Sequence, residues 1–174
     1  MKNKKGLSAI IATVLIILLV TAATAIVWAF VNNIINDQTE GVQSCFEVES
    51  GEKVILNDYY TCFDSDRKEV RFSITIADAE IDSLLVSIAA GGTSKSFTLN
   101  NTEVVVTNLR PYQGINGEAV NLPGQNEGKT YVAEGFSLES SIDSIKIAPI
   151  IGEKQCGVSD STYNVEDCSL FAFD

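Results

Sequence analysis

Residues 7–31 read LSAIIATVLIILLVTAATAIVWAFV, and this run contains no charged side chain. Three lysines, Lys2, Lys4 and Lys5, stand before it, and the next charged residue along the chain is Asp37. As an α-helix the run would be about 37 Å long, which exceeds the roughly 30 Å of hydrocarbon in a bilayer. Large apolar residues fall on every side of such a helix, so either lipid or a bundle of like helices has to surround it.

The charges on either side of the run predict its orientation in a membrane. Lysines before it and acidic residues after it, Asp37 and Glu40, place the N-terminus in the cytoplasm by the positive-inside bias. Three interpretations follow. The run is a secretory signal peptide cut near Ala23-Thr24-Ala25, a plain membrane anchor, or a helix that is retained after cleavage at Gly6 on the cytoplasmic side. A signal peptide cut there would leave the apolar end IVWAFV, and a plain anchor gives Gly6 no role.

A resemblance favours the third interpretation. Residues 4–34, KKGLSAIIATVLIILLVTAATAIVWAFVNNI, resemble the N-terminus of the archaeal type IV pilin and archaellin family. In that family a membrane prepilin peptidase cuts after a glycine that follows a short basic leader, and the apolar helix stays on the subunit. The resemblance implies cleavage between Gly6 and Leu7. Bacterial type IV pilins carry a glutamate five residues into the mature chain, where this sequence has Ile11, and this difference favours the archaeal branch.

The expected organisation has three parts: a basic leader over residues 1–6, a hydrophobic transmembrane or filament-core helix over 7–40, and an extracellular domain over 41–174. Gly41 is the predicted end of the helix, because glycine commonly follows the last helical turn. Small residues of the run, such as Ala12, Ala22 and Ala25, allow close helix packing without water. The predicted fold class is α+β, with the long helix followed by an antiparallel β-sandwich of the immunoglobulin-like or pilin type.

The sandwich prediction depends on period-two alternation of apolar residues after the helix. In residues 69–77, for example, Val70, Phe72 and Ile74 fall on one face of a strand. Strands are predicted over residues 69–77, 81–90, 95–99, 102–109, 130–138, 141–147 and 169–173. Residues 114–128 are rich in Gly and Asn and predict a long surface loop. The segments IDSLLVSIAAG (81–91) and IDSIKIAPIIG (142–152) are similar, either as equivalent strands or by chance.

The four cysteines, Cys45, Cys62, Cys156 and Cys168, predict two disulfides in an oxidising compartment. Their spacing lacks the short gap of a zinc site. Four cysteines allow three connectivities. Of these, Cys45–Cys62 with Cys156–Cys168 is preferred because each bond closes a short loop.

Composition argues against several function classes. The 174 residues include 12 Lys and Arg, 23 Asp and Glu and no His, giving a net charge of -11. An acidic chain is a poor partner for nucleic acid, and without histidine the usual triads and His-ligated metal sites are excluded. We expect no enzymatic activity, cofactor or metal.

Three local features carry predictions of their own. Asp64-Ser-Asp66 is interpreted as a solvated hairpin turn rather than a calcium loop, since Arg67 and Lys68 follow it. Asn100-Asn101-Thr102 is an N-glycosylation sequon, so Asn100 is a candidate modification site. Tyr59 and Tyr60, with Phe171 and Phe173, are expected to be buried in the sandwich, the alternative being a subunit contact.

The resemblance implies a filament subunit. Its expected partners are further copies of itself, the prepilin peptidase, the pilus assembly platform with its ATPase, and the membrane before assembly. Adhesion or motility would be the purpose of an extracellular cell-surface filament. The alternative is a single-pass anchored extracellular binding domain that does not polymerise and keeps its leader.

Overall fold

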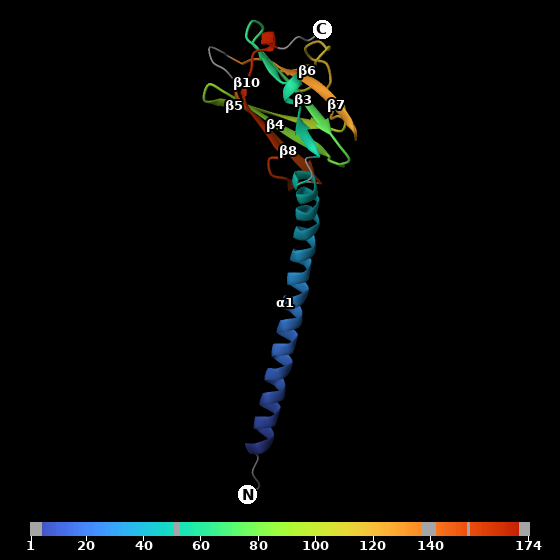
Figure 1. Cartoon of the computed structure of the whole chain (residues 1–174). Helices are drawn as coiled ribbons and strands as arrows, with labels where there is room; N and C mark the ends of the chain where they lie inside the picture. The colour runs from blue at the N-terminus through green and yellow to red at the C-terminus, as the bar shows by residue number, and fades with distance from the viewer. Residues whose placement is uncertain (1–4, 51–52, 137–141, 153, 171–174) are drawn as a thin grey trace. The chain divides into compact units, whose positions relative to one another are not determined.

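A computed structural model describes residues 5–50, 53–136, 142–152 and 154–170 of the chain. Side chains are described for these residues apart from 5–9, 36–43 and 49–50. The chain divides into two compact units, Met1–Glu40 and Gly41–Asp174. The layout is α+β, with an N-terminal helix followed by two antiparallel sheets (Figure 1).

The first element is α1, Lys5–Ser50, a helix of 46 residues. The prediction that it ends at Gly41 is wrong, because the helix continues for two further turns. A glycine inside a helix costs about 1 kcal/mol relative to alanine. Beyond Gly41, however, the side chains of Cys45 and Val48 are buried within the second unit, and Val48 belongs to its hydrophobic core. This burial offsets the local cost of the glycine.

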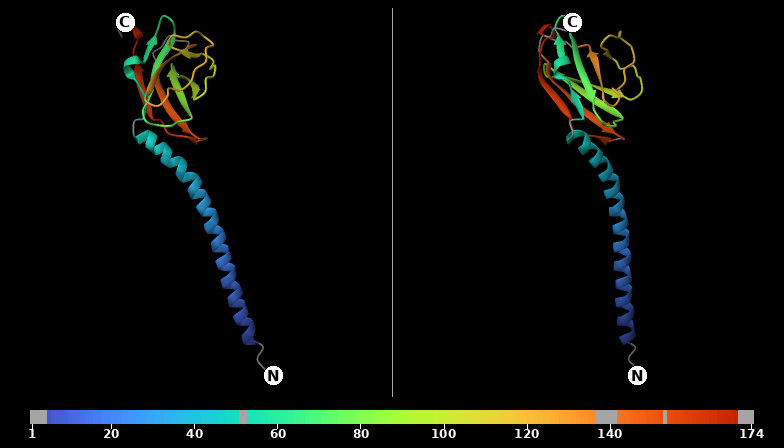
Figure 2. Two further views of the ribbon diagram at one scale, coloured as in Figure 1. Left: turned by 90° about the vertical axis from the view of Figure 1, so that its right-hand side faces the viewer. Right: turned by 45° about the vertical axis from the view of Figure 1, so that its right-hand side comes forward.

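One five-stranded sheet, sheet A, is built around β3. Its strands are β1 (Val54–Leu56), β2 (Cys62–Asp64), β3 (Glu69–Ile76), β6 (Leu109–Pro111) and β7 (Glu127–Ala133). The order is β1-β3-β7-β6, and β2 also pairs with β3. The short 3-10 helix η1, Asp58–Tyr60, connects β1 to β2. The connection between β6 and β7, yellow in Figure 2, extends away from the strands.

The second five-stranded sheet, sheet B, is built around β4 and β8. Its strands are β4 (Ser83–Ala90), β5 (Thr93–Asn100), β8 (Ile142–Ile151), β9 (Lys154–Gln155) and β10 (Asp160–Val165). The order is β10-β8-β4-β5, and β9 also pairs with β8. A second 3-10 turn, η2 (Cys168–Leu170), follows β10. The two similar segments of the sequence become β4 and β8, which are antiparallel neighbours with Val86 opposite Ile147.

Both sheets contribute to one hydrophobic core. Phe72 and Ile74 of β3 belong to the same buried cluster as Val86 and Ile88 of β4 and Ile147 of β8. Phe72 also stacks on Tyr131 of β7, with ring centroids 5.5 Å apart. In β4 every second residue is buried, as the period-two alternation predicts, whereas β8 has neighbouring buried residues at 144–145 and 147–149 and is covered on both faces there.

Three predicted strands differ from the structure. Residues 102–109 form no continuous strand: Val104 makes an isolated bridge to Val120, and only Leu109 begins β6. Val104 and Val105 are both exposed, whereas Val106 packs against the core and Leu109 is buried, so burial does not alternate along the segment as it would in a strand with one buried face. Of the predicted strand 169–173, Ser169 and Leu170 lie in the 3-10 turn η2, and 171–173 fall outside the described residues. The strand predicted over residues 130–138 ends earlier, at Ala133 of β7, and residues 134–136 are not in a strand. Its predicted end at Leu138 and the predicted start of the next strand at Ser141 fall outside the described residues.

Candidate functional site

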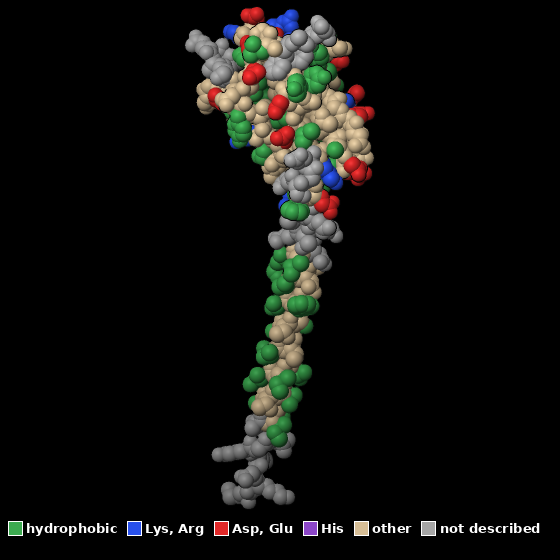
Figure 3. Space-filling view, viewed as in Figure 1, with side chains coloured by type: hydrophobic (Ala, Val, Ile, Leu, Met, Phe, Trp, Pro, Cys, Tyr) green, Lys and Arg blue, Asp and Glu red, His purple; other side chains and the backbone are tan. Residues whose placement is uncertain are grey.

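The apolar part of α1 is exposed along its whole described length. Ile10–Ile35, 26 residues, is long and apolar enough to cross a membrane, and an 18-residue window within it has a mean hydropathy of 2.9. No residue of this span is buried within the chain. At about 1.5 Å per residue it measures about 39 Å. Figure 3 shows hydrophobic side chains along this stretch. The helix could therefore anchor the chain in a bilayer, where no protein contact is required to cover it.

The threonines within this span do not interrupt its apolar character. The hydroxyl of Thr13 donates to the carbonyl oxygen of Ile10 at 2.8 Å, and that of Thr21 donates to Leu18 at 3.0 Å. Thr24 donates to the carbonyls of Val20 and Thr21 in the same way. Since each hydroxyl is satisfied inside the helix, its transfer out of water costs less than that of an unpaired hydroxyl.

The proposed processing site lies at the beginning of the helix. Lys5, Gly6 and Leu7 have helical backbone in α1. Their side chains, and the whole of Lys2 and Lys4, lie outside what the structure describes. Cleavage between Gly6 and Leu7 therefore stays a prediction.

All four cysteines form disulfides, but the predicted pairing is wrong. Cys45 bonds to Cys156 and Cys62 bonds to Cys168, with Cα–Cα distances of 5.3 and 4.9 Å. The preference for short loops failed because strand pairing, and not separation along the chain, decides which cysteines meet. The parallel bridge between Phe63 and Asp167 brings β2 beside the segment after β10, and so places Cys62 next to Cys168.

The candidate glycosylation site is the last residue of β5. Asn100 is partly buried, opposite Ser83 in the ladder, and its carbonyl oxygen accepts from the amide of Leu122 at 2.8 Å. The next residue, Asn101, donates through its side chain to the carbonyl of Ile81 at 2.9 Å. Thr102 is exposed. Modification of Asn100 stays a prediction.

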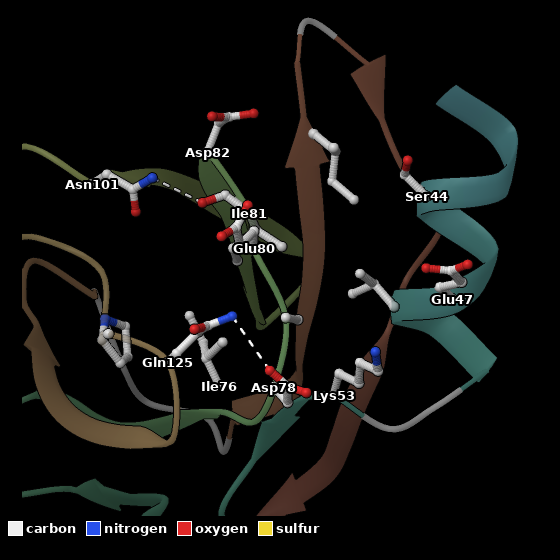
Figure 4. A pocket seen from close by; sticks show the side chains of 15 residues that line it. Ser44, Glu47, Lys53, Ile76, Asp78, Glu80, Ile81, Asp82, Asn101 and Gln125 are labelled. Carbon is white, nitrogen blue, oxygen red and sulfur yellow. Dashed lines mark hydrogen bonds between the residues drawn. The ribbon is translucent and has the colours of Figure 1, made fainter. Parts of the chain in front are cut away.

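An acidic cleft of about 780 Å³ lies beside the last turns of α1, within the second unit (Figure 4). Glu47, Asp78, Glu80 and Asp82 line it together with Lys53. Asp82 accepts from the amide of Gly152 at 2.6 Å. Among the residues described, no group of three or more acidic or cysteine side chains is placed to hold a metal ion. The cleft is an acidic surface feature of the second unit.

The turn at Asp64-Ser-Asp66 is a hairpin turn between β2 and β3, as predicted. The side chain of Asp64 accepts from the amide of Arg67 at 3.0 Å and from the guanidinium of Arg71 at 3.2 Å. These bonds hold the turn closed with the residues of the chain itself.

The chain's three arginines, Arg67, Arg71 and Arg110, all line one shallow pocket of about 350 Å³. Arg110 is the most enclosed in carboxylates: its Nε lies 2.7 Å from Glu134, and its Nη2 lies 3.0 Å from both oxygens of Glu69. The same guanidinium donates to the carbonyl of Gly114 at 3.2 Å. The cluster therefore ties the β6–β7 connection to β3 and to the end of β7.

The pKa values in this cluster shift in the direction that stabilises the charges. Burial alone would raise the pKa of Glu134, but hydrogen bonds from Arg110 and Asn116 outweigh it, and the pKa is lowered. Burial opposes the charge of Arg110 too, and its bonds to Glu134 and Glu69 raise its pKa nonetheless. Because the one guanidinium of Arg110 pairs with both Glu69 and Glu134, the three side chains hold one another in place, and we assign the cluster a structural role.

The tyrosines of η1 contradict the prediction that they are buried. Tyr59 is 80% exposed and Tyr60 is 53% exposed. Both lie in η1, a single 3-10 turn without a buried residue, which Asn57 caps by accepting from the amide of Tyr59 at 3.1 Å. Tyr163 of β10, 60% exposed, was not singled out from the sequence. The sequence signal for Tyr163 is a single aromatic residue within the polar segment DSTYNV. Phe171 and Phe173 lie outside the described residues.

Comparisons of this chain with protein-family models, with curated proteins and with solved structures find no match.

Proposed function

We propose that this chain is a structural subunit, a pilin, of an archaeal type IV pilus-like surface filament. One observation carries the proposal: Ile10–Ile35 is apolar and exposed on all sides, and the helix that contains it continues to Ser50. A helix that is apolar all round needs complete covering. A bilayer provides this before assembly and a bundle of identical helices provides it afterwards, with every backbone hydrogen bond kept inside the helix.

The residues before the helix support processing by a prepilin peptidase. Lys2, Lys4 and Lys5 would hold the leader in the cytoplasm. Removal of residues 1–6 would take away these charges and let the helix leave the bilayer. The partners would be further copies of the chain, the peptidase, and the assembly platform with its ATPase.

The second unit would form the outer surface of the filament and serve adhesion or motility rather than catalysis. Two disulfides are typical of proteins in oxidising compartments and support an extracellular location. Since both sheets contribute to one core, we propose that they pack face to face as a pilin-type sandwich.

The test is the substitution Gly6→Val, with Ser8→Val as a control that adds bulk two positions away from the junction. The chain is expressed in an archaeal host with a prepilin peptidase, and the surface fraction is analysed by mass, N-terminal sequencing and electron microscopy. The proposal expects a wild-type chain beginning at Leu7 and visible filaments. Gly6→Val should stay uncut in the membrane, without filaments, and Ser8→Val should be cut.

A wild-type chain that still begins at Met1 and forms no filaments would contradict the proposal. It would favour the anchored domain that does not polymerise. A chain cut between Ala25 and Ile26 would instead show a secretory signal peptide.

A further inference from the structure

A shallow pocket of about 310 Å³ lies between η1 and β10 in the second unit. Two aromatic side chains line it: Tyr59, from η1, and Tyr163, from β10. They are 80% and 60% exposed, so neither ring is needed to fill the core. Exposed aromatic rings gathered at one concave place mark a binding surface more often than rings scattered singly.

The same pocket is also lined by polar residues whose side chains can donate or accept hydrogen bonds. The carboxylates of Asp58 and Glu166, the amide of Asn164 and the hydroxyl of Thr162 line it beside the two rings. Asn164 has a φ of 53°, in the left-handed region. The other described non-glycine residues with positive φ, Lys68, Asn108 and Asn126, lie in turns, whereas Asn164 lies within a strand. A sparsely populated conformation inside a strand is found disproportionately at functional sites.

The backbone beneath the pocket is fixed on both sides. The hydroxyl of Thr61 donates to the carbonyl of Asn57 at 2.8 Å, which closes η1. The amide of Phe63 donates to the carbonyl of Glu166 at 2.8 Å, which joins the two walls. The disulfide Cys62–Cys168 cross-links the same two segments just beyond. Because the walls are held before any ligand arrives, binding loses little conformational entropy there.

We propose that this pocket binds a neutral saccharide, a polymer of β-linked hexopyranoses. A pyranose ring with equatorial hydroxyls presents C–H groups on its faces, and these stack on the faces of aromatic rings. Its hydroxyls, which project at the edge, donate to carboxylates and amides such as those of Asp58, Glu166 and Asn164. The pocket combines both kinds of group.

The charge of the pocket disfavours two other candidates, an anionic saccharide and a second copy of this chain. Lys146 offsets part of the negative charge at the pocket, since its Nζ lies 5.8 Å from the centroid of the Tyr163 ring. The carboxylates of Asp58 and Glu166 outnumber this one cation and repel an anionic saccharide. They also disfavour a second copy of this chain, whose net charge is -11. A neutral saccharide meets no such repulsion. The inference deepens the proposed function, because it names what an adhesive surface of such a filament would hold, but binding itself does not require a filament.

The experiment uses the full chain in micelles of a zwitterionic detergent without a sugar head group. Isothermal titration is run with hexamers of β-1,4-linked glucose and of β-1,4-linked N-acetylglucosamine, and with polygalacturonate as the anionic comparison. Tyr59→Ala and Tyr163→Ala remove the rings, and Tyr59→Phe keeps one. Tyr60→Ala is the matched control, since Tyr60 is the next residue, is exposed and does not line the pocket.

We expect saturable binding of at least one neutral hexamer and none of polygalacturonate. Each alanine variant should raise the dissociation constant by about tenfold or more, as expected for an anchor residue at a binding site. Tyr60→Ala and Tyr59→Phe should stay within about threefold of the wild type. Mobility on a non-reducing gel checks that each variant keeps both disulfides.

Failure of both neutral hexamers to bind would overturn the inference, as would binding that survives both alanine substitutions. If the wild-type chain binds no saccharide and the Tyr59→Ala variant also forms no filaments, the rings form a contact between copies of the chain. Saccharide binding by a chain that never forms filaments would contradict the proposed function and support this inference.

Discussion

Cys45 and Cys156 stand 111 positions apart in the chain, and a disulfide holds their Cα atoms 5.3 Å apart. Cys45 lies in α1 shortly before its end, and Cys156 directly follows β9. The second bond, Cys62–Cys168, has a separation of 106 and crosses the first along the chain. Together they tie the end of the helix and the segment after β10 into the two sheets.

The first prediction concerns the pairing itself. Cys45→Ala should leave a free thiol at Cys156, while Cys62 and Cys168 stay bonded. Alkylation without reduction, followed by peptide mass analysis, locates the free thiol. Cys62→Ala is the matched control and should free Cys168 instead. A free thiol at Cys62 in the Cys45→Ala variant would support pairing between sequence neighbours and contradict the structure.

The second prediction is the stability that the Cys45–Cys156 bond contributes. Closing a loop of about 100 residues restricts the unfolded chain, and removing a native disulfide typically costs about 2–5 kcal/mol. The double variant Cys45→Ala/Cys156→Ala should lower the free energy of unfolding of the second unit by this amount. Urea titration followed by tyrosine circular dichroism measures it. A change below about 1 kcal/mol would mean that packing of Val48 alone holds the end of the helix.

The third prediction compares two arginines. Arg110→Met leaves the partly buried carboxylates of Glu69 and Glu134 without their cation, which should cost about 2–4 kcal/mol of stability. Arg67→Met is the control. Arg67 lies 4.0 Å from Asp64 with its side chain 67% exposed, and such a surface pair contributes at most about 1 kcal/mol. Thermal unfolding of both variants tests this, and equal losses would contradict a structural role particular to Arg110.

Much of this architecture follows from the sequence because it depends on local periodicity. The uncharged run over residues 7–31 predicts the apolar helix, and the alternation at Val70, Phe72 and Ile74 predicts β3. β10 was missed because its sequence, DSTYNV, is polar and lies at the edge of a sheet, where one side of the strand is not covered. Edge strands carry little hydrophobic pattern to predict them from.

The surface features could not be predicted because they depend on contacts between distant segments. The pairing of Cys62 with Cys168 requires knowing that β2 lies beside the segment after β10. The same contact brings Tyr59 and Tyr163 into one pocket. The end of the helix was misplaced because Gly41 is a local signal, while the burial of Val48 is a tertiary one.

The fourth prediction is a loss of stability in acid. The backbone amide of Ser169 and the side chain of Ser65 lead the hydrogen bonds that lower the pKa of Asp167 to about 2 from 3.8. Glu134 is also lowered from 4.5. A carboxylate with a depressed pKa stabilises the fold above its unfolded value, and the contribution is lost as the pH falls. Stability should therefore decline between about pH 4.5 and 2.

The variant Asp167→Asn isolates one part of this decline. It should be less stable than the wild type at pH 7 and should lose less stability on acidification. Ser169→Ala keeps the backbone amide that Asp167 accepts from at 2.9 Å, so it should retain most of the wild-type pH dependence. Urea midpoints measured from pH 7 to pH 2 give the pH dependence of stability for each variant. An Asp167→Asn variant with the full wild-type slope would assign the decline to other carboxylates.

The last prediction tests whether the helix crosses a membrane. Val20 lies near the centre of the span Ile10–Ile35, and Ile34 lies at its end. An arginine at the centre of a membrane helix costs about 2.5–3.5 kcal/mol, whereas one near the end extends its charge to the interface. Val20→Arg should therefore increase the fraction of chain released from membranes by alkaline carbonate, and Ile34→Arg should resemble the wild type. Equal release of both variants would mean that the helix is covered by protein rather than by lipid before assembly, and the order of events proposed for the filament would have to change.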